Sequence, residues 1–418
     1  MTGNAAWLLA CRVAADLLNL LLFVLISRQF GPEGTGMYAY GFAIASFLFA
    51  ATTMGVEKYA IREYTRADGA HRSRLLQDVL GTQLCVGVIA LLGLALYILA
   101  TKPDVPTLIS ILALTAYQLG NAIAATLFVP AMAEQQMMPP AVSFLASRSL
   151  AFILTGVLIL VAHCSLPTAL TAFATSGIII LILSARSARA HGQILSIHVS
   201  VDALREQTGA MWSFASIDLL GQVMSRIGVV VLKLFEGGAA AGVYATGLKL
   251  IEAAYLTLYF IGSAAYPRLC RSFHEDPRDF RRLGMRLLVF SMAIAALIAA
   301  SMYWIVPHLL VPIFGPHYEG TQALIASMAI LAFAQSAEVM PGRILLAANL
   351  QVERAAMVAA AAVLCAVLNF ALVPQWGIHA ANFSTTAAYI VLCLLYARTL
   401  HARSGRQQSV RAALKEWL

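Results

Sequence analysis

Charged residues are scarce in this sequence. Only 11% of the 418 residues are Asp, Glu, Lys or Arg, while 60% are hydrophobic and the mean hydropathy is +0.79. A typical soluble domain carries about 25% charged residues, so this chain has too little polar surface to cover a soluble core. Because about 20 residues cross a bilayer, the length accommodates roughly a dozen membrane-spanning helices and leaves little for a soluble domain.

The sequence also lacks the motifs of several functional classes. Its six cysteines lie singly, with no CxxC pair and no zinc-type Cys/His spacing, so we expect no disulfide framework, no metal site and no cofactor. No Walker A sequence occurs, so transport energy would come from an ion gradient or from substrate supply. The first apolar segment contains Arg12 and Asp16 without a cleavage-site pattern, which predicts a retained helix rather than a signal peptide.

Apolar runs separated by charged or Gly/Pro breaks predict an all-α integral membrane protein. The expected helices are 7–27, 37–60, 77–99, 106–132, 141–162, 166–184, 210–234, 241–266, 284–313, 321–348, 355–374 and 378–399. Pro307 and Pro312 predict a kink near the end of the ninth expected helix, 284–313. Lys and Arg concentrate in the segments after predicted helices two, six, eight and ten and in the tail, which predicts that both termini are cytoplasmic. The net charge of +8 is then a topology signal, and no nucleic-acid partner is expected.

The two halves of the chain resemble each other. The first and seventh predicted helices align at an offset of 205 residues, which pairs Trp7 with Trp212, and after one inserted residue 36–41 aligns with 242–247. Six helices is an even number, so the copies would be parallel repeats about an axis along the membrane normal. We therefore expect two parallel six-helix lobes. Their predicted limits are 1–184 and 209–400, with a cytoplasmic linker at 185–208 and a basic amphipathic tail at 401–418.

Ionisable residues within the apolar runs are the candidate functional residues, because each costs roughly 2.5 to 3.5 kcal/mol to insert into a membrane. The candidate diphosphate- and sugar-binding cations are Arg12, Arg148, Arg226 and Lys249, and the candidate ion-coupling acids are Asp16, Asp218, Glu252 and Glu338. Arg12 with Asp16 and Lys249 with Glu252 are spaced so that each pair could instead simply neutralise itself on one helix face. No catalytic residue is expected.

Several short motifs resemble those of one transporter family. They are the loop 27–38 (SRQFGPEGTGMY), Gly242–Val–Tyr244–Ala245, Lys249–Leu–Ile–Glu252, 265–269 (AYPRL) and 313–318 (IFGPHY). The loop is similar to the R-x-h-G-P-x-x-h-G-x-Y pattern, with h apolar, of bacterial polysaccharide transporters, although Thr35 replaces the usual bulky apolar residue. This family includes the O-antigen-type lipid-linked oligosaccharide flippases of the multidrug/oligosaccharidyl-lipid/polysaccharide exporter superfamily.

The resemblance implies a V-shaped two-lobed exporter, not an enzyme, in the bacterial inner membrane. It would move an undecaprenyl-diphosphate-linked oligosaccharide, a repeat unit of O-antigen, capsule or exopolysaccharide, from the cytoplasmic to the periplasmic leaflet by alternating access. The resemblance also implies H+ or Na+ as the coupling ion and a monomeric protein. The implied partners are a polysaccharide polymerase and a chain-length regulator.

Three other functions remain open. A cation-coupled multidrug extruder of the same superfamily would favour acidic over basic residues in its cavity, and Arg148 and Arg226 count against it. A membrane oligosaccharide polymerase or ligase normally needs a sizeable periplasmic loop carrying Arg and His, whereas the predicted outer loops are about ten residues or shorter. A membrane scaffold without transport activity is less consistent with a repeat of half the chain.

Overall fold

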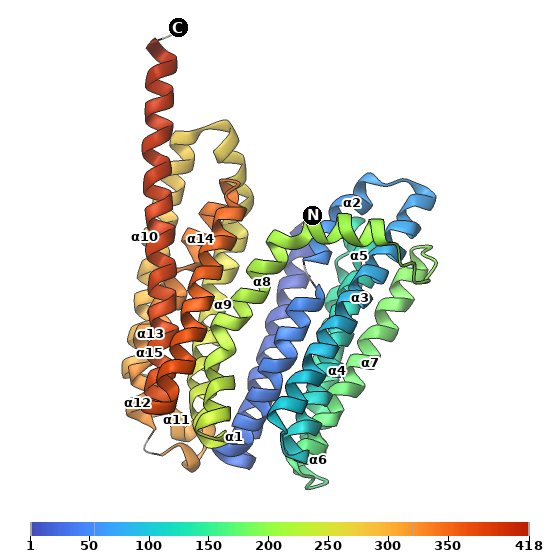
Figure 1. Ribbon diagram of the computed structural model, residues 1–418, viewed down its shortest axis with the longest axis vertical. Helices are drawn as coiled ribbons and strands as arrows, with labels where there is room; N and C mark the ends of the chain where they lie inside the picture. The colour runs from blue at the N-terminus through green and yellow to red at the C-terminus, as the bar shows by residue number, and fades with distance from the viewer. Residues whose placement is uncertain (1, 54, 320, 417–418) are drawn as a thin grey trace. The chain divides into compact units, whose positions relative to one another are not determined.

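The computed structural model describes residues 2–53, 55–319 and 321–416, and every regular element in these ranges is helical. The longer helices are α1 (Thr2–Thr53), α3 (Gly69–Thr101), α4 (Val105–Leu127), α6 (Met138–Leu160), α7 (Leu166–Ala190), α8 (Val201–Phe235), α9 (Gly238–Glu275), α10 (Pro277–Trp304) and α15 (Gln351–Glu416). The shorter elements are α2 (Val56–Arg66), α5 (Val129–Ala133), α11 (Val306–Phe314), the 3-10 turn η1 (Pro316–Tyr318), α12 (Gln322–Ser327), α13 (Ala329–Ala337) and α14 (Val339–Ala347). Figure 1 shows their course.

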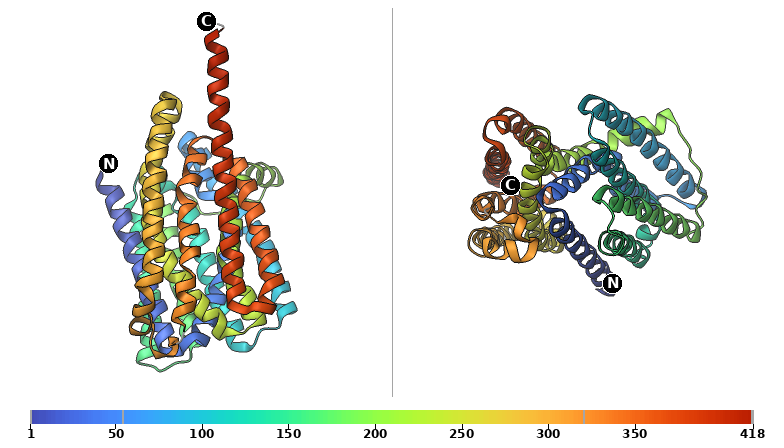
Figure 2. Two further views of the ribbon diagram at one scale, coloured as in Figure 1. Left: turned by 90° about the vertical axis from the view of Figure 1, so that its left-hand side faces the viewer. Right: turned by 90° about the horizontal axis from the view of Figure 1, so that it is seen from below.

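Two of the long helices contain a sharp reversal. Gly31 in α1 has φ 61° and ψ −164°, and Gly377 in α15 has φ 54° and ψ −132°, conformations that glycine adopts at little steric cost. Pro32 follows the first break and lacks the N–H that would continue the helical hydrogen bonds. Both ribbons turn back on themselves (Figures 1 and 2). The described residues hold ten helical stretches long and apolar enough to span a membrane. The stretches in α1 and α15 contain the breaks at Gly31 and Gly377. Dividing each of them at its break gives the predicted twelve crossings.

Several predicted boundaries need correction. The expected helix 37–60 stops at Thr53, because Gly55 adopts φ 70° and starts the separate helix α2. The expected helix 321–348 is built from three short segments, α12, α13 and α14, that meet at Met328 and Glu338. The kink predicted near Pro307 is confirmed as a break at Ile305, with Pro307 in the first turn of α11.

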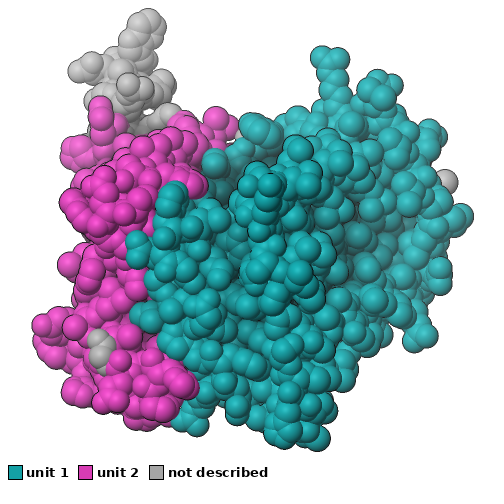
Figure 3. All heavy atoms as spheres, turned by 60° about the horizontal axis from the view of Figure 1, so that its bottom comes forward, with its two compact units in different colours: residues 1–243 teal, residues 244–418 magenta. Residues whose placement is uncertain are grey.

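The chain forms two compact units, residues 1–243 and 244–418, coloured separately in Figure 3. The lobe limits expected from the repeat, 1–184 and 209–400, stay a prediction. Within the predicted linker 185–208, α7 extends to Ala190, residues 191–200 are not helical, and α8 begins at Val201. In the predicted tail, the side chains from residue 403 onward and residues 417–418 lie outside the described part of the chain.

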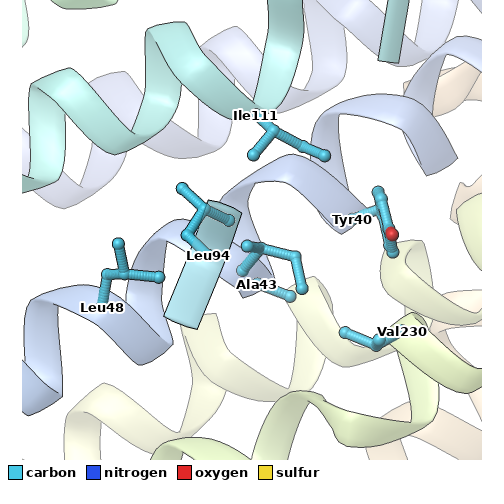
Figure 4. Packing of buried hydrophobic residues seen from close by; sticks show 7 residues of the cluster. Tyr40, Ala43, Leu48, Leu94, Ile111 and Val230 are labelled. Atoms are coloured by element: carbon cyan, nitrogen blue, oxygen red, sulfur yellow. The ribbon is translucent and has the colours of Figure 1, made fainter. Parts of the chain in front are cut away.

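One apolar core of unit 1 brings together helices from distant parts of the sequence (Figure 4). Its buried members are Tyr40, Ala43, Ile44, Leu48, Leu94, Ile111 and Val230, which lie on α1, α3, α4 and α8. The Tyr40 and Tyr97 hydroxyls lie 2.7 Å apart beside this core. Because lipid tails are as apolar as these side chains, close packing and hydrogen bonds supply most of the attraction between such helices.

Equivalent glycines make equivalent contacts in both halves of the chain. A Cβ on Gly41 of α1 would lie 3.1 Å from Leu114 Cδ1 of α4 within unit 1. A Cβ on its aligned partner Gly247, on α9, would overlap the Met328 sulfur at the end of α12 and lie 3.0 Å from Ile325 Cδ1, both within unit 2. In each unit, therefore, a glycine at the same repeat position fits a helix of the same unit closely, as a duplicated bundle predicts.

The aligned pair Gly36 and Gly242, both in unit 1, pack directly against each other. A Cβ on Gly242 would overlap the backbone carbonyl of Pro32 and lie 2.9 Å from the Gly36 nitrogen. A Cβ on Gly36 would overlap the carbonyl oxygen of Gly238. Neither position has room for a side chain, so glycine is required at the point where these two helix-opening turns meet.

This packing predicts the effect of adding one methyl group. Gly242→Ala should lower the thermal unfolding midpoint of the purified protein in detergent, because overpacking against backbone typically costs about 1 to 3 kcal/mol. Gly221→Ala on α8 is the matched control, since nothing lies within 4 Å of the added Cβ, and its midpoint should be unchanged or higher. Equal midpoints for Gly242→Ala and the parent protein would contradict the packing described for the two turns.

Candidate functional site

Arg148 on α6 lies against an aromatic ring instead of a carboxylate. Its guanidinium carbon is 5.1 Å from the ring centre of Tyr117 on α4, and Tyr117 is fully buried. The Nη1 atom of Arg148 is itself buried and has no hydrogen-bond partner. Burying a donor without a partner typically costs about 1 to 3 kcal/mol of stability. This guanidinium is therefore suited to bind an anionic ligand, to which Nη1 would donate a hydrogen bond.

Asp16 is the predicted acid that lies in the region of Arg148. Tyr117 is under the electrostatic influence of Arg148 and, more weakly, of Asp16, a half-buried carboxylate on α1. Arg12 and Asp218, by contrast, are exposed at the surface of unit 1. Sequence spacing alone did not pair Asp16 with Arg148, because the two residues lie on different helices.

Arg226 on α8 also lies over an aromatic ring. Its guanidinium carbon is 5.1 Å from the ring centre of Phe42 on α1, and its Nε donates a hydrogen bond of 3.0 Å to Gln222 Oε1. A cation over a ring face gains about 0.5 to 2 kcal/mol, depending on how far the pair is removed from water. Both arginines singled out from the sequence are therefore held in unit 1 by the same type of contact.

A continuous chain of four rings connects these two contacts. The ring centres are 5.2 Å apart for Tyr117 and Phe173, 6.1 Å for Phe173 and Tyr38, and 5.8 Å for Tyr38 and Phe42. The rings come from α1, α4 and α7, and three of the four are almost fully buried. Arg148 and Arg226 thus occupy opposite ends of one aromatic chain, which we call the ring chain.

The predicted charges of unit 2 are arranged differently. Lys249 Nζ lies 3.4 Å from Glu252 Oε2 on the same face of α9, so these two residues form the ion pair that their spacing allows. Glu338, where α13 meets α14, interacts electrostatically with Arg343 and Arg354 and is hydrogen-bonded to Tyr255. Acidic and basic groups therefore offset one another in this unit.

Sequence reasoning missed the roles of Arg343 and Arg354. Arg354 lies in the predicted cytoplasmic connection after the tenth helix, and its Nε donates to the Tyr396 hydroxyl at 3.1 Å. Arg343 donates from Nη2 to Ser263 Oγ at 3.3 Å and lies 4.8 Å from the ring centre of Tyr259. The detectable signal was the polar spacing of Tyr259 and Ser263 along one face of α9, four residues apart.

No metal centre emerges from the side chains that the structure describes, because no three His, Cys, Asp or Glu residues come together to hold an ion. The six cysteines are free thiols.

Comparison with known proteins places this geometry in context. A family model described as "Polysaccharide biosynthesis protein" matches residues 1–273, which confirms the resemblance predicted from the loop motifs. No curated protein sequence matches the chain at a significant level.

Solved structures share the fold at low sequence identity. The lipid II flippase MurJ in an inward closed conformation is 13% identical, with a TM-score of 0.72 over 94% of this chain and 87% of that one. A MATE family multidrug resistance transporter of the MOP superfamily, in an inward-facing conformation, is 12% identical, with a TM-score of 0.68 over 93% and 95%. The eukaryotic MATE transporter AtDTX14 is 13% identical, with a TM-score of 0.63 over 97% and 98%. These likenesses establish the fold of this chain as that of the superfamily.

The ring chain makes a specific prediction for stability. Tyr117→Leu removes the ring beneath Arg148 and the edge contact with Phe173, and should cost about 1 to 3 kcal/mol. Tyr117→Phe keeps the ring and should unfold within about 2 °C of the parent protein in detergent, since a small change in free energy shifts the midpoint of a large protein little. If both variants unfold at the same temperature, the ring does not support the guanidinium.

Proposed function

Since this chain belongs to the polysaccharide biosynthesis protein family, we propose that it is a flippase for undecaprenyl-diphosphate-linked oligosaccharide. It moves the repeat unit of an O-antigen, capsule or exopolysaccharide from the cytoplasmic to the periplasmic leaflet of the inner membrane by alternating access. The observation that carries this proposal is the buried, unpartnered Nη1 of Arg148.

The chemistry of the substrate fits the way this arginine is held. A guanidinium presents several donors in a fixed plane and matches the oxygens of a phosphate group, which an aromatic ring cannot satisfy. The Tyr117 ring stabilises the positive charge of Arg148 from one face and leaves its edge donors available. We propose that Arg148 binds the diphosphate, and that Arg226 and Arg12 contact the diphosphate or the sugars. A substrate contact of Lys249 stays a prediction.

We propose Asp16 as the coupling acid among the four candidates. As an anion it competes with the diphosphate for Arg148, because both groups lie near Tyr117. Uptake of a coupling ion by Asp16 would remove this competition and strengthen substrate binding. Glu252 and Glu338 already offset cations in unit 2, and Asp218 is exposed, so these three acids are the weaker candidates.

Substitution of either ring-held arginine tests the binding site. Arg148→Ala and Arg226→Ala should each reduce surface glycan by roughly tenfold or more at unchanged protein level, because a lost charge-assisted hydrogen bond costs about 1.5 to 3 kcal/mol. The glycan is measured on the cell surface and the protein by immunoblotting of membranes. Arg281→Ala is the matched control, since Arg281 is exposed near the start of α10 and should be neutral. Normal glycan in both test variants would overturn the site assignment.

Neutralising Asp16 separates binding from transport. Asp16→Asn should bind an undecaprenyl-diphosphate oligosaccharide several-fold more tightly in detergent and yet export less glycan in cells, because the competing charge and the coupling group are lost together. The gain in affinity should vanish in the Arg148→Ala background, as a double-mutant cycle would measure. Weaker binding by Asp16→Asn, or full export, would exclude Asp16 as the coupling acid.

A further inference from the structure

Residues 191–200, between α7 and α8, form an ordered extended segment that we call the strap. Figure 1 shows it at the edge of unit 1, at the end of the unit where the chain begins. The arginine distribution predicts that this end is cytoplasmic. The strap was expected to be part of a solvated linker, but its contacts with α3 are extensive.

Polar groups hold one side of the strap against α2 and α3. Gln193, which is buried, donates to the Tyr64 hydroxyl at 2.8 Å and accepts from Ser73 Oγ at 3.1 Å. Gln77 Nε2 donates to the carbonyl oxygen of Ile194 at 3.1 Å, and His198 Nδ1 lies 2.5 Å from Asp78 Oδ1. The strap is therefore fixed in position along about one and a half turns of α3.

Packing reinforces these hydrogen bonds. Leu195 packs against the buried cluster formed by Leu76, Leu80, Leu127 and Ala188. A Cβ on Gly81 would overlap the carbonyl oxygen of His198, so the absence of a side chain at Gly81 allows the backbone of the strap to lie directly on the helix.

Aliphatic side chains of the strap and of the start of α8 are exposed. Ile194, Ile197, Val199 and Val201, which begins α8, are 68%, 64%, 57% and 78% exposed within the structure. Val199 also lies close to Gly81 of α3, and Ser196 and His198 are exposed between the aliphatic residues. Four exposed large aliphatic side chains within eight residues, which we call the apolar edge, normally mark a contact with another phase or molecule.

The position of the strap on α3 identifies this contact. Gly81 lies on the same helical face as Val88, Leu92 and Leu99, which are exposed and follow it at spacings of seven, four and seven residues. These apolar side chains form the lipid-facing surface of a membrane-spanning helix. The strap covers the part of the same helical face that lies toward the N-terminus of α3.

Depth along α3 places the strap at the membrane boundary. About 20 helical residues cross the hydrocarbon core of a bilayer. Counted from the end of α3 at Thr101, this length reaches the region of Gly81. The residues of α3 before Gly81 therefore lie at the level of the headgroups or beyond. The helices that adjoin the strap carry exposed basic side chains, namely Arg74 on α3, Arg186 and Arg189 on α7 and Arg205 on α8, together with the exposed acids Asp202 and Glu206 on α8.

From these observations we infer that the strap is a membrane-surface anchor, with Ile194, Ile197, Val199 and Val201 inserted at the headgroup–acyl boundary of the inner leaflet. The exposed arginines of α3, α7 and α8 bind anionic phospholipid headgroups, because basic side chains near a membrane are attracted to its negatively charged surface. The linker is thereby tied to α3 on one side and to the bilayer on the other. This inference does not depend on the identity of the transported substrate.

Site-directed spin labelling tests the anchor. In protein reconstituted into phosphatidylethanolamine–phosphatidylglycerol vesicles, with native cysteines replaced and export retained, a nitroxide at Ile197→Cys should be more accessible to oxygen than to a water-soluble nickel chelate. A nitroxide at the matched control His71→Cys, ten residues before Gly81 on α3, should show the reverse. A label at 197 that behaves like the label at 71 would place the strap in water. A label at 197 shielded from both reagents would instead indicate a protein partner or a second copy, and either result overturns the inference.

Displacing the strap supplies an independent test. Gly81→Leu should push the strap off α3 and raise the nickel accessibility of the label at 197 at least about twofold, whereas Gly93→Leu, where nothing lies within 4 Å of the Cβ, should leave it unchanged. In vesicles of phosphatidylethanolamine alone, the label should lie less deeply than with phosphatidylglycerol present. Unchanged accessibility in Gly81→Leu would show that the contact with α3 does not position the apolar edge, and equal depth in the two lipid mixtures would exclude the anionic headgroup contact.

Discussion

The energetic cost of holding a positive charge among apolar helices is the constraint on which the organisation of unit 1 depends. Aromatic rings offset part of this energetic cost, since Arg148 lies over Tyr117 and Arg226 lies over Phe42. A ring stabilises a cation without neutralising it, in contrast to a carboxylate. Because the two supporting rings belong to one buried chain of four, the packing of α1, α4 and α7 fixes both guanidinium groups. Both cations are thus positioned, and Nη1 of Arg148 has no hydrogen-bond partner.

In unit 2, acidic side chains and hydroxyl groups stabilise the positive charges instead. Lys249 is paired with Glu252, and Glu338 interacts with Arg343 and Arg354. Removing one partner from such a set leaves an uncompensated charge, so its members are strongly interdependent. The aligned glycines Gly41 and Gly247 each pack closely against a helix of their own unit, yet the electrostatics of the two units differ. This difference is why we assign the principal anion-binding role to unit 1.

Much of the fold could be predicted from the sequence, because apolar length and charge placement govern insertion into a bilayer. The number of crossings and the breaks near Pro32 and Pro307 followed from these rules. The ring chain did not, since Tyr38, Tyr117 and Phe173 are distant in sequence and only packing brings them together. The contact of Arg354 with Tyr396 could not be predicted for a related reason, because the position of a residue at a helix end does not reveal its long-range partners. The ordered strap depends on long-range contacts such as His198 with Asp78.

The most direct test of the account is transbilayer movement of a fluorescent undecaprenyl-diphosphate oligosaccharide in proteoliposomes containing the purified protein. We predict movement that is roughly tenfold slower for the undecaprenyl-monophosphate analogue, because that analogue lacks one phosphate group to accept charge-assisted hydrogen bonds from the ring-held arginines. A cationic dye should not accumulate under the same ion gradient. Equal movement of both lipids, or dye transport without lipid movement, would contradict a diphosphate-selective flippase.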